Sequence, residues 1–262
     1  MNYEKLLYEV SDGIATITLN RPEAYNALND QLAREIHDAV IVSSEDEAVR
    51  VVVLTGTGRA FCAGGDVKSF CDHIDHIGAL VKRLTTDLHG AVSRMIRMPK
   101  PVINAINGVA AGGGMSLALA GDLILATESA TFTMAYTKIG ASPDGSSTFT
   151  LPRLVGVKRA LELTMLNPVL TAKEAVEWGI VNRVFPDDQF ETEVHNIALQ
   201  LAQGPTQAYG RAKALYYAST NESLETQMEH ETLAIAACGK TADFREGVFS
   251  FSEKRTPTFQ GR

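Results

Sequence analysis

Two glycine-rich segments of this chain could hold a negative charge that develops on a substrate oxygen. The first reads TGTGRAFCAGGDV (residues 55–67) and the second AAGGGMSLALAGD (110–122). Each follows an apolar run and leads into a helical pattern, so each leaves backbone N–H groups without partners at the start of a helix. Two such groups directed at one carbonyl oxygen would form an oxyanion hole, and glycine lets the backbone approach the substrate closely. Tight packing of helix against strand is the alternative explanation.

Asp144 is the carboxylate that could supply acid–base chemistry. It stands in the middle of IGASPDGSST (139–148), whose proline, glycines and small hydroxyl residues indicate a loop. Pro-Asp-Gly is also a common turn tripeptide, in which the aspartate bonds to nearby backbone. The tripeptide alone therefore favours a turn residue over a catalytic one. Neither glycine-rich segment has the spacing of a dinucleotide fingerprint or a P-loop lysine, and the chain has no G-x-S-x-G elbow.

The elements that must position these residues are predicted by hydrophobic periodicity. Residues 5–20 read as two strands around a turn, and the apolar runs 49–56 and 101–109 are typical of buried strands in a parallel sheet. Helical patterns cover 29–46 and 75–98. From Asp187 onward only helical patterns remain. This order predicts an α/β body over residues 1–200, with parallel strands and crossover helices, and a helical C-terminal region over 201–262.

Composition narrows the class of protein. The 262 residues are 45% hydrophobic and 21% charged, the balance of a soluble globular protein. A net charge of −7 and the absence of a basic stripe count against a nucleic-acid partner. No signal peptide or apolar run of membrane length is visible, so no membrane contact is expected. Three cysteines are an odd and sparse set, which favours a reducing compartment, and we predict a cytoplasmic protein.

Several motifs, in register over nearly the whole chain, resemble the crotonase, or enoyl-CoA hydratase/isomerase, superfamily. They are LNRPEAYNALN (19–29), AFCAGGDVK (60–68), INGVAAGGGMSLALAGDLILAT (106–127), LTAKEAVEWGIVNRVF (170–185) and the closing FREGVFSFSEKRTPTF. The resemblance implies a crotonase-like spiral of ββα turns with a C-terminal helical trimerisation region. It also implies an acyl-CoA substrate, no cofactor apart from the coenzyme A of the substrate, no metal, and a homotrimer or a hexamer made of two trimers.

The resemblance also implies which residues contact the substrate. The two oxyanion N–H groups fall on Gly65 and Gly113, in agreement with the interpretation of the two glycine-rich segments. Contacts with the acyl-CoA are expected from Ala24, Leu28, Ala63, Gly65, Asp66, Val67, Gly112, Gly113 and Tyr136. Lys68 could reach a CoA phosphate or could simply be a solvated helix lysine.

The reaction depends on which acids and bases the site holds. The two glutamates of the family's hydratases correspond to Ser116 and Tyr136 here, so enoyl-CoA hydratase activity is the weakest of three alternatives. Asp144 stands where enoyl-CoA isomerases of the phenylacetate type and 4-chlorobenzoyl-CoA dehalogenases carry an aspartate. As an isomerase base, Asp144 would remove a proton from the acyl chain and return it elsewhere. As a dehalogenase nucleophile it would form an aryl ester, with His89 as the base that activates water. We rank the isomerase first.

Three other interpretations of the sequence are weaker. CDHIDH (71–76) gathers possible metal ligands, but its spacing matches no recognised zinc pattern. RNA binding, which some proteins of this fold show, is disfavoured by the negative net charge. A serine hydrolase would pair Ser142, Ser146 or Ser147 with His89, although a lone histidine is more often structural or solvated.

Overall fold

The body of the protein is built on a large sheet. In the computed structural model, which describes residues 3–262, its order is β1 (Leu6–Ser11), β2 (Ile14–Leu19), β3 (Val51–Gly56), β5 (Val102–Ile106), β7 (Leu123–Thr127) and β10 (Arg183–Phe185). β1 pairs antiparallel with β2 through the tight turn at Asp12 and Gly13, and the other strands run parallel. The predicted hairpin and parallel strands are therefore confirmed.

A second, smaller sheet lies beside it. Its strands are β4 (Ala60–Cys62), β6 (Val109–Ala111), β8 (Thr131–Thr133) and β9 (Leu170–Thr171), of which the first three run parallel. From the sequence, β4 was expected to be part of a glycine-rich loop, and the start of β6 was expected to belong to the preceding strand. Strands of three residues are too short to show an alternating pattern. Each glycine-rich segment thus leaves a strand of the small sheet and then enters a helix.

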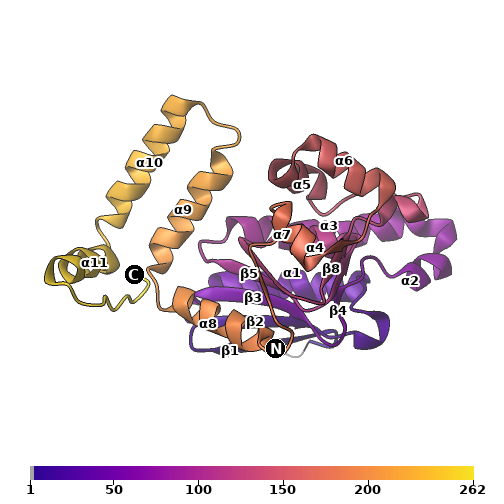
Figure 1. The fold of residues 1–262 in the computed structure, drawn as a ribbon, viewed down its shortest axis with the longest axis horizontal. Coiled ribbons are helices and arrows are strands. Elements are labelled where there is room, and N and C mark those ends of the chain that lie inside the picture. The colour runs from indigo at the N-terminus through magenta and orange to yellow at the C-terminus, as the bar shows by residue number, and fades with distance from the viewer. Residues whose placement is uncertain (1–2) are drawn as a thin grey trace.

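Helices cover both faces of the large sheet (Figure 1). Those of the body are α1 (Asp30–Glu45), α2 (Val67–Asp72), α3 (Ile77–Arg97), α4 (Gly113–Ala118), α5 (Ser147–Val155), α6 (Val157–Leu166), α7 (Ala172–Glu177) and α8 (Phe190–Ala202). α1 and α3 pack on each other over the main core, and α8 packs on β2, β3 and β7 over a separate core. α5 begins directly after the loop of Asp144 and was not predicted.

Side-chain caps fix where several of these helices begin. The Asn29 side chain accepts a hydrogen bond from Leu32 N at the start of α1. Thr171 and Glu174 form a capping box at the start of α7, with Glu174 N donating to Thr171 Oγ1 over 3.2 Å. Such caps satisfy backbone N–H groups that would otherwise be unpaired.

The C-terminal helices stand away from the body in Figure 1. They are α9 (Thr206–Ala218), α10 (Leu224–Cys238) and α11 (Ala242–Glu253). Lys213 of α9 forms a buried ion pair with Asp122, with Nζ 2.7 Å from Oδ2, and this pair fastens α9 to the end of the sheet. The division between residues 200 and 201 stays a prediction. Within residues 3–262 no helix is both long enough and apolar enough to cross a membrane.

Candidate active site

A cavity of about 300 Å³ lies where the two glycine-rich segments meet α3 and the loop before α5. We call it the glycine-loop cavity. Its walls are mostly apolar, and the side chains that close it include Leu28, Val67, Phe70, Val81, Leu84, Leu88 and Ile139. Two charged residues, Lys138 and Asp144, are part of the lining, and Lys138 is exposed. Asp144 is therefore the carboxylate that an apolar ligand in this cavity would meet.

The two glycine-rich segments touch each other at the wall of this cavity. Gly64 has a φ of +100°, and a Cβ at that position would lie 2.9 Å from Ala111 O and 3.4 Å from Gly113 N. Only glycine fits such a conformation and such a close approach. Leu28 ties the first segment in place, because its N–H donates to Gly64 O over 2.7 Å and its carbonyl accepts from Asp66 N over 2.9 Å.

The amides of Gly65 and Gly113 are the free donors at this contact. Neither donates to an acceptor among residues 3–262, and Gly113 is the first residue of α4, where the amide has no intrahelical partner. Both glycines line the cavity, as do the predicted substrate contacts Ala63 and Gly112. The arrangement can offer two backbone N–H groups to one carbonyl oxygen.

Asp144 presents its carboxylate to the cavity and uses its backbone for the turn. Its carbonyl oxygen accepts hydrogen bonds from Ser147 N over 3.1 Å and from Ser147 Oγ over 2.7 Å. The carboxylate Oδ1 instead accepts from the hydroxyl of Tyr136 over 2.5 Å. The side chain of Asp144 is thus held by Tyr136 of the cavity wall, and it takes no part in the hydrogen bonds of the turn.

A chain of three polar groups supports this carboxylate. The Tyr136 hydroxyl lies 2.7 Å from Ser116 Oγ as well as 2.5 Å from Asp144 Oδ1. Burial, together with the negative charge of Asp144 and its hydrogen bond, raises the pKa of Tyr136 above its ordinary value. The phenol therefore stays protonated and donates to Asp144, which leaves Ser116 to donate to Tyr136. The second carboxylate oxygen remains available to a ligand.

The loop that carries Asp144 is fixed by its neighbours. Gly145 has a φ of +58°, and a Cβ there would lie 2.8 Å from the Cβ of buried Ser116. Ser146, a residue with a side chain, also has a positive φ of 69°. Backbone held in this region costs free energy and persists where the surrounding packing imposes it. The packing of Gly145 on Ser116 therefore sets how far Asp144 reaches into the cavity.

His89 lies beside the glycine-loop cavity and is not part of its lining. It is exposed on α3, next to Leu88, which points into the cavity, because successive helix residues are rotated by about 100°. Its Nε2 accepts a hydrogen bond from Gly145 N over 3.1 Å. The lone pair that a base would use is thus occupied by a backbone amide. Among residues 3–262, no hydrogen bond joins His89 to Ser142, Ser146 or Ser147.

Two other predicted contacts also lie outside the lining. Ala24 belongs to a short 3-10 turn, Pro22–Ala24. Asp66 pairs with Arg21 over 2.8 Å and caps α2 by accepting from Ser69 N over 3.1 Å. Burial opposes the ionisation of Asp66, but these hydrogen bonds outweigh it and lower its pKa. Asp66 is thus a structural anion in this conformation.

Of the side chains that α3 contributes to the lining, Val81 and Leu84 were not predicted as ligand contacts. Leu80, Leu84 and Leu88 follow one apolar stripe of the helix, and sequence analysis gives no reason to separate core positions from cavity positions on that stripe. Leu84 and Leu88 line the cavity, whereas Leu80 does not. Within the described residues, no group of three or more His, Cys, Asp or Glu side chains could hold a metal ion, the segment 71–76 included.

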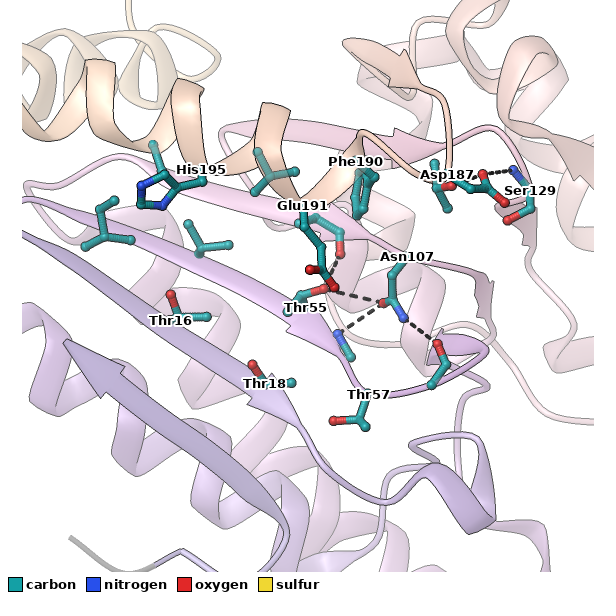
Figure 2. Close-up of a pocket in the computed structure, with 18 residues that line it drawn as sticks. Thr16, Thr18, Thr55, Thr57, Asn107, Ser129, Asp187, Phe190, Glu191 and His195 are labelled. Atoms are coloured by element: carbon teal, nitrogen blue, oxygen red, sulfur yellow. Dashed lines mark hydrogen bonds between the residues drawn. The ribbon is translucent and has the colours of Figure 1, made fainter. Parts of the chain in front are cut away.

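A larger cavity, of about 570 Å³, lies on the α8 side of the large sheet. Figure 2 shows Thr16, Thr18 and Thr55 on neighbouring strands beneath helix α8, and we call this space the threonine cavity. Thr55 Oγ1 donates to Ala105 O over 2.9 Å. Asn107 accepts from Gly56 N over 3.1 Å and donates to Gly58 O over 2.9 Å. The hydrogen-bonding groups of Thr55 and Asn107 thus serve the fold itself.

Comparison with known proteins places this geometry in a family. The model of the enoyl-CoA hydratase/isomerase family matches residues 9–262. The chain therefore belongs to the enoyl-CoA hydratase/isomerase family. It is 38% identical to the 1,2-epoxyphenylacetyl-CoA isomerase of Escherichia coli, with 99% of each chain covered. It is 39% identical to 4-chlorobenzoyl coenzyme A dehalogenase-1 of an Arthrobacter species, over 94% of this chain and 90% of that one.

Solved structures of enoyl-CoA hydratase/isomerase proteins confirm the predicted fold class. The crystal structure of an enoyl-CoA hydratase from Bacillus anthracis superposes with a TM-score of 0.92 at 33% identity, covering 99% of this chain and all of that one. The crotonase-like α/β fold with C-terminal helices is thus established for this enzyme family member. Its relatives include an isomerase, a dehalogenase and a hydratase, so the particular reaction has to be inferred from the residues of the site.

Proposed function

We propose that this protein is an enoyl-CoA isomerase in which Asp144 moves the proton. The observation that carries the proposal is a single carboxylate, Asp144, in an apolar cavity whose wall also carries the free amides of Gly65 and Gly113. A thioester enolate is a high-energy anion, and two fixed N–H donors stabilise it on the oxygen where the charge develops. A carboxylate beside the acyl chain can then act as base and as acid.

The proposed reaction uses two backbone amides and one carboxylate. The thioester oxygen of a 3-enoyl-CoA accepts from Gly65 N–H and Gly113 N–H. Asp144 removes a proton from C2, and the electrons of that C–H bond form a dienolate with its charge on the thioester oxygen. Asp144 then delivers the proton to C4, and the double bond moves to C2–C3. Because Tyr136 binds Oδ1, the other oxygen of Asp144 serves both transfers.

Hydrogen bonds within the site favour the isomerase over the hydratase and the dehalogenase. A hydratase needs two carboxylates around a water, whereas Ser116 and Tyr136 stand at those positions and are bonded to each other. A dehalogenase with Asp144 as nucleophile needs a base to open the aryl ester, and Nε2 of His89 is occupied by Gly145 N–H. The isomerase needs neither a second carboxylate nor a histidine. These observations rank it first, and the dehalogenase second.

A panel of thioesters tests this proposal. The purified protein is incubated with 3-enoyl-CoA, 2-enoyl-CoA and 4-chlorobenzoyl-CoA, and the products are identified by mass spectrometry and NMR. We expect conversion of the 3-enoyl-CoA to its 2-enoyl isomer. Release of chloride with an aryl adduct on Asp144 would replace the isomerase by the dehalogenase, and formation of a 3-hydroxyacyl-CoA would replace it by a hydratase.

We also propose that the protein assembles as a homotrimer through its C-terminal helices. Large apolar side chains of these helices are between 49% and 88% exposed; they are Tyr216, Leu224, Met228, Leu233, Ile235, Phe249 and Phe251. Exposed apolar area of this extent marks an interaction surface in a soluble protein. Sedimentation at micromolar concentration should show a trimer, or a hexamer made of two trimers, and a monomer would contradict the proposal.

A further inference from the structure

A third cavity, of about 940 Å³, lies where the body meets the C-terminal helices. We call it the arginine cavity. Five cationic residues line it, and they are Arg50, Arg97, Lys100, Arg211 and Arg262. Glu47 is the one carboxylate side chain of its lining. This excess of positive charge stands out in a chain whose net charge is −7.

Two of the cations are fastened in place by neutral oxygens. Lys100 Nζ donates to Ser43 O over 2.8 Å and to Asp46 O over 2.6 Å. Arg50 donates to Thr206 Oγ1 over 3.0 Å and to the carbonyl oxygens of Gly204 and Phe259. Carbonyl and hydroxyl oxygens orient these cations, while the carboxylates of Asp46, Glu45 and Glu47 attract Lys100 from nearby. Asp243 attracts Arg50, but its own oxygens bind Gln260 N and Gly261 N.

Arg262 donates to Gln260 Oε1, whereas the other two arginines of the cavity, Arg97 and Arg211, have no side-chain partner among the described residues. Within residues 3–262, Arg97 at the end of α3 and Arg211 on α9 make no hydrogen bond or ion pair through their side chains. Arg211 Nε is buried and has no acceptor. A buried donor without a partner costs free energy, so the arrangement is complete only when an acceptor is present. Planar guanidinium groups bind phosphate oxygens in pairs, which an ammonium group cannot do.

We propose that the arginine cavity binds a small anion with two or more phosphate groups, held between Arg97 of the body and Arg211 of the C-terminal helices. Lys100 and Arg50 supply further positive charge around it. The volume exceeds that of a diphosphate alone, which leaves room for an organic group attached to it. Because the two arginines belong to α3 and α9, a bound anion would also fasten the C-terminal helices to the body.

This site is separate from the glycine-loop cavity. The two cavities share no lining residue. Both use α3, but at different positions: Leu84 and Leu88 face the glycine-loop cavity, and Arg97 faces the arginine cavity. At a rise of about 1.5 Å per residue, Leu84 and Arg97 are about 20 Å apart along the helix. The proposal therefore does not depend on the proposed isomerase activity.

Isothermal titration calorimetry with inorganic pyrophosphate tests the proposal on the full chain. We expect saturable binding to the wild type at low ionic strength and weaker binding as salt is added. R97Q and R211Q should each weaken binding about tenfold or more, because each removes a charge-assisted donor. R94Q is the matched control: Arg94 is an exposed cation one turn before Arg97 that does not line the cavity, so binding should be unchanged.

Thermal unfolding completes the test. Pyrophosphate should raise the Tm of wild type and R94Q but not of R97Q or R211Q. Absence of binding, or equal binding in all four proteins, would overturn the proposal. So would loss of oligomeric state in R97Q and R211Q without pyrophosphate binding, which would assign the cavity to a contact between copies.

Discussion

The glycine-loop cavity and the threonine cavity show why size does not identify an active site. The threonine cavity is the larger, at about 570 Å³ against about 300 Å³. Its Thr55 and Asn107 are hydrogen-bonded to the backbone of their own sheet and loops. In the glycine-loop cavity the amides of Gly65 and Gly113 have no protein partner, and one oxygen of Asp144 is available. An active site of this kind needs N–H donors that are free to bind the substrate and a carboxylate that a hydrogen bond holds in place. The glycine-loop cavity has both.

The largest expected effect in this comparison comes from Asp144. D144N should lower isomerase turnover by about a hundredfold to ten-thousandfold, because an amide cannot accept the C2 proton at neutral pH. D144E should keep part of the activity, limited by the displacement of the carboxylate by one methylene. Steady-state kinetics with a 3-enoyl-CoA checks both variants. Circular dichroism serves as the control for folding, and full activity in folded D144N would return Asp144 to the role of a turn residue.

The next effect concerns the free amides. G113P deletes the N–H of Gly113, and proline is tolerated at the first position of a helix, so α4 should still form. We expect turnover to fall about a hundredfold or more. G113A is the matched control, since it keeps the N–H and adds only a Cβ near Leu28 at 3.1 Å. Near-normal turnover in a folded G113P protein would remove this amide from the mechanism.

A smaller effect is expected at Tyr136. Y136F removes the donor to Asp144 Oδ1 and leaves the ring in place, so turnover should fall about tenfold. The pKa of Tyr136 is raised by its burial and by the negative charge of Asp144, so the phenol stays protonated and keeps donating to Asp144 Oδ1 up to alkaline pH. The loss of turnover in Y136F should therefore be the same factor at neutral and at alkaline pH. Turnover equal to that of the wild type would limit Tyr136 to packing.

The smallest effect should come from the threonine cavity. T18V keeps the shape of a β-branched side chain and removes a hydroxyl that faces this cavity. We expect turnover within about twofold of the wild type and a free energy of unfolding changed by about 0.5 kcal/mol. Kinetics and denaturant unfolding check this. A loss of activity comparable to that of Y136F would show that the threonine cavity also takes part in the reaction.

Much of the fold follows from the sequence because its long elements have clear periodicity. The hairpin β1–β2, strands β3 and β5 and helices α1 and α3 were predicted from apolar patterns. The small sheet was not, because β4 and β6 have only three residues each, and the close approach of the glycine segments depends on them. Helix α5 was missed because it follows directly from a loop rich in turn residues and contains Pro152.

The candidate site was predictable in part. The family motifs point to Gly65, Gly113, Ser116, Tyr136 and Asp144, and the structure brings all five together at one cavity or directly beside it. The orientation of the side chains depends on contacts between segments, which the sequence does not show. Neighbours in sequence can face different ways, so His89 turns to Gly145 N while Leu88 faces the cavity. The hydrogen-bonded order of Ser116, Tyr136 and Asp144 has no sequence signal, because the three residues come from separate segments.

The central claim is that Asp144 takes a proton from C2 of the acyl chain. NMR can follow the exchange of the C2 hydrogens of a 3-enoyl-CoA with D₂O, in wild type and in D144N. The account predicts that the wild type moves the double bond and places on C4 the hydrogen that Asp144 carries, which is the C2 proton or, where the Asp144 carboxyl group has exchanged with D₂O, deuterium. D144N should neither isomerise the substrate nor exchange its C2 hydrogens faster than the enzyme-free background. Equal rates of isomerisation and exchange in the two proteins would contradict it.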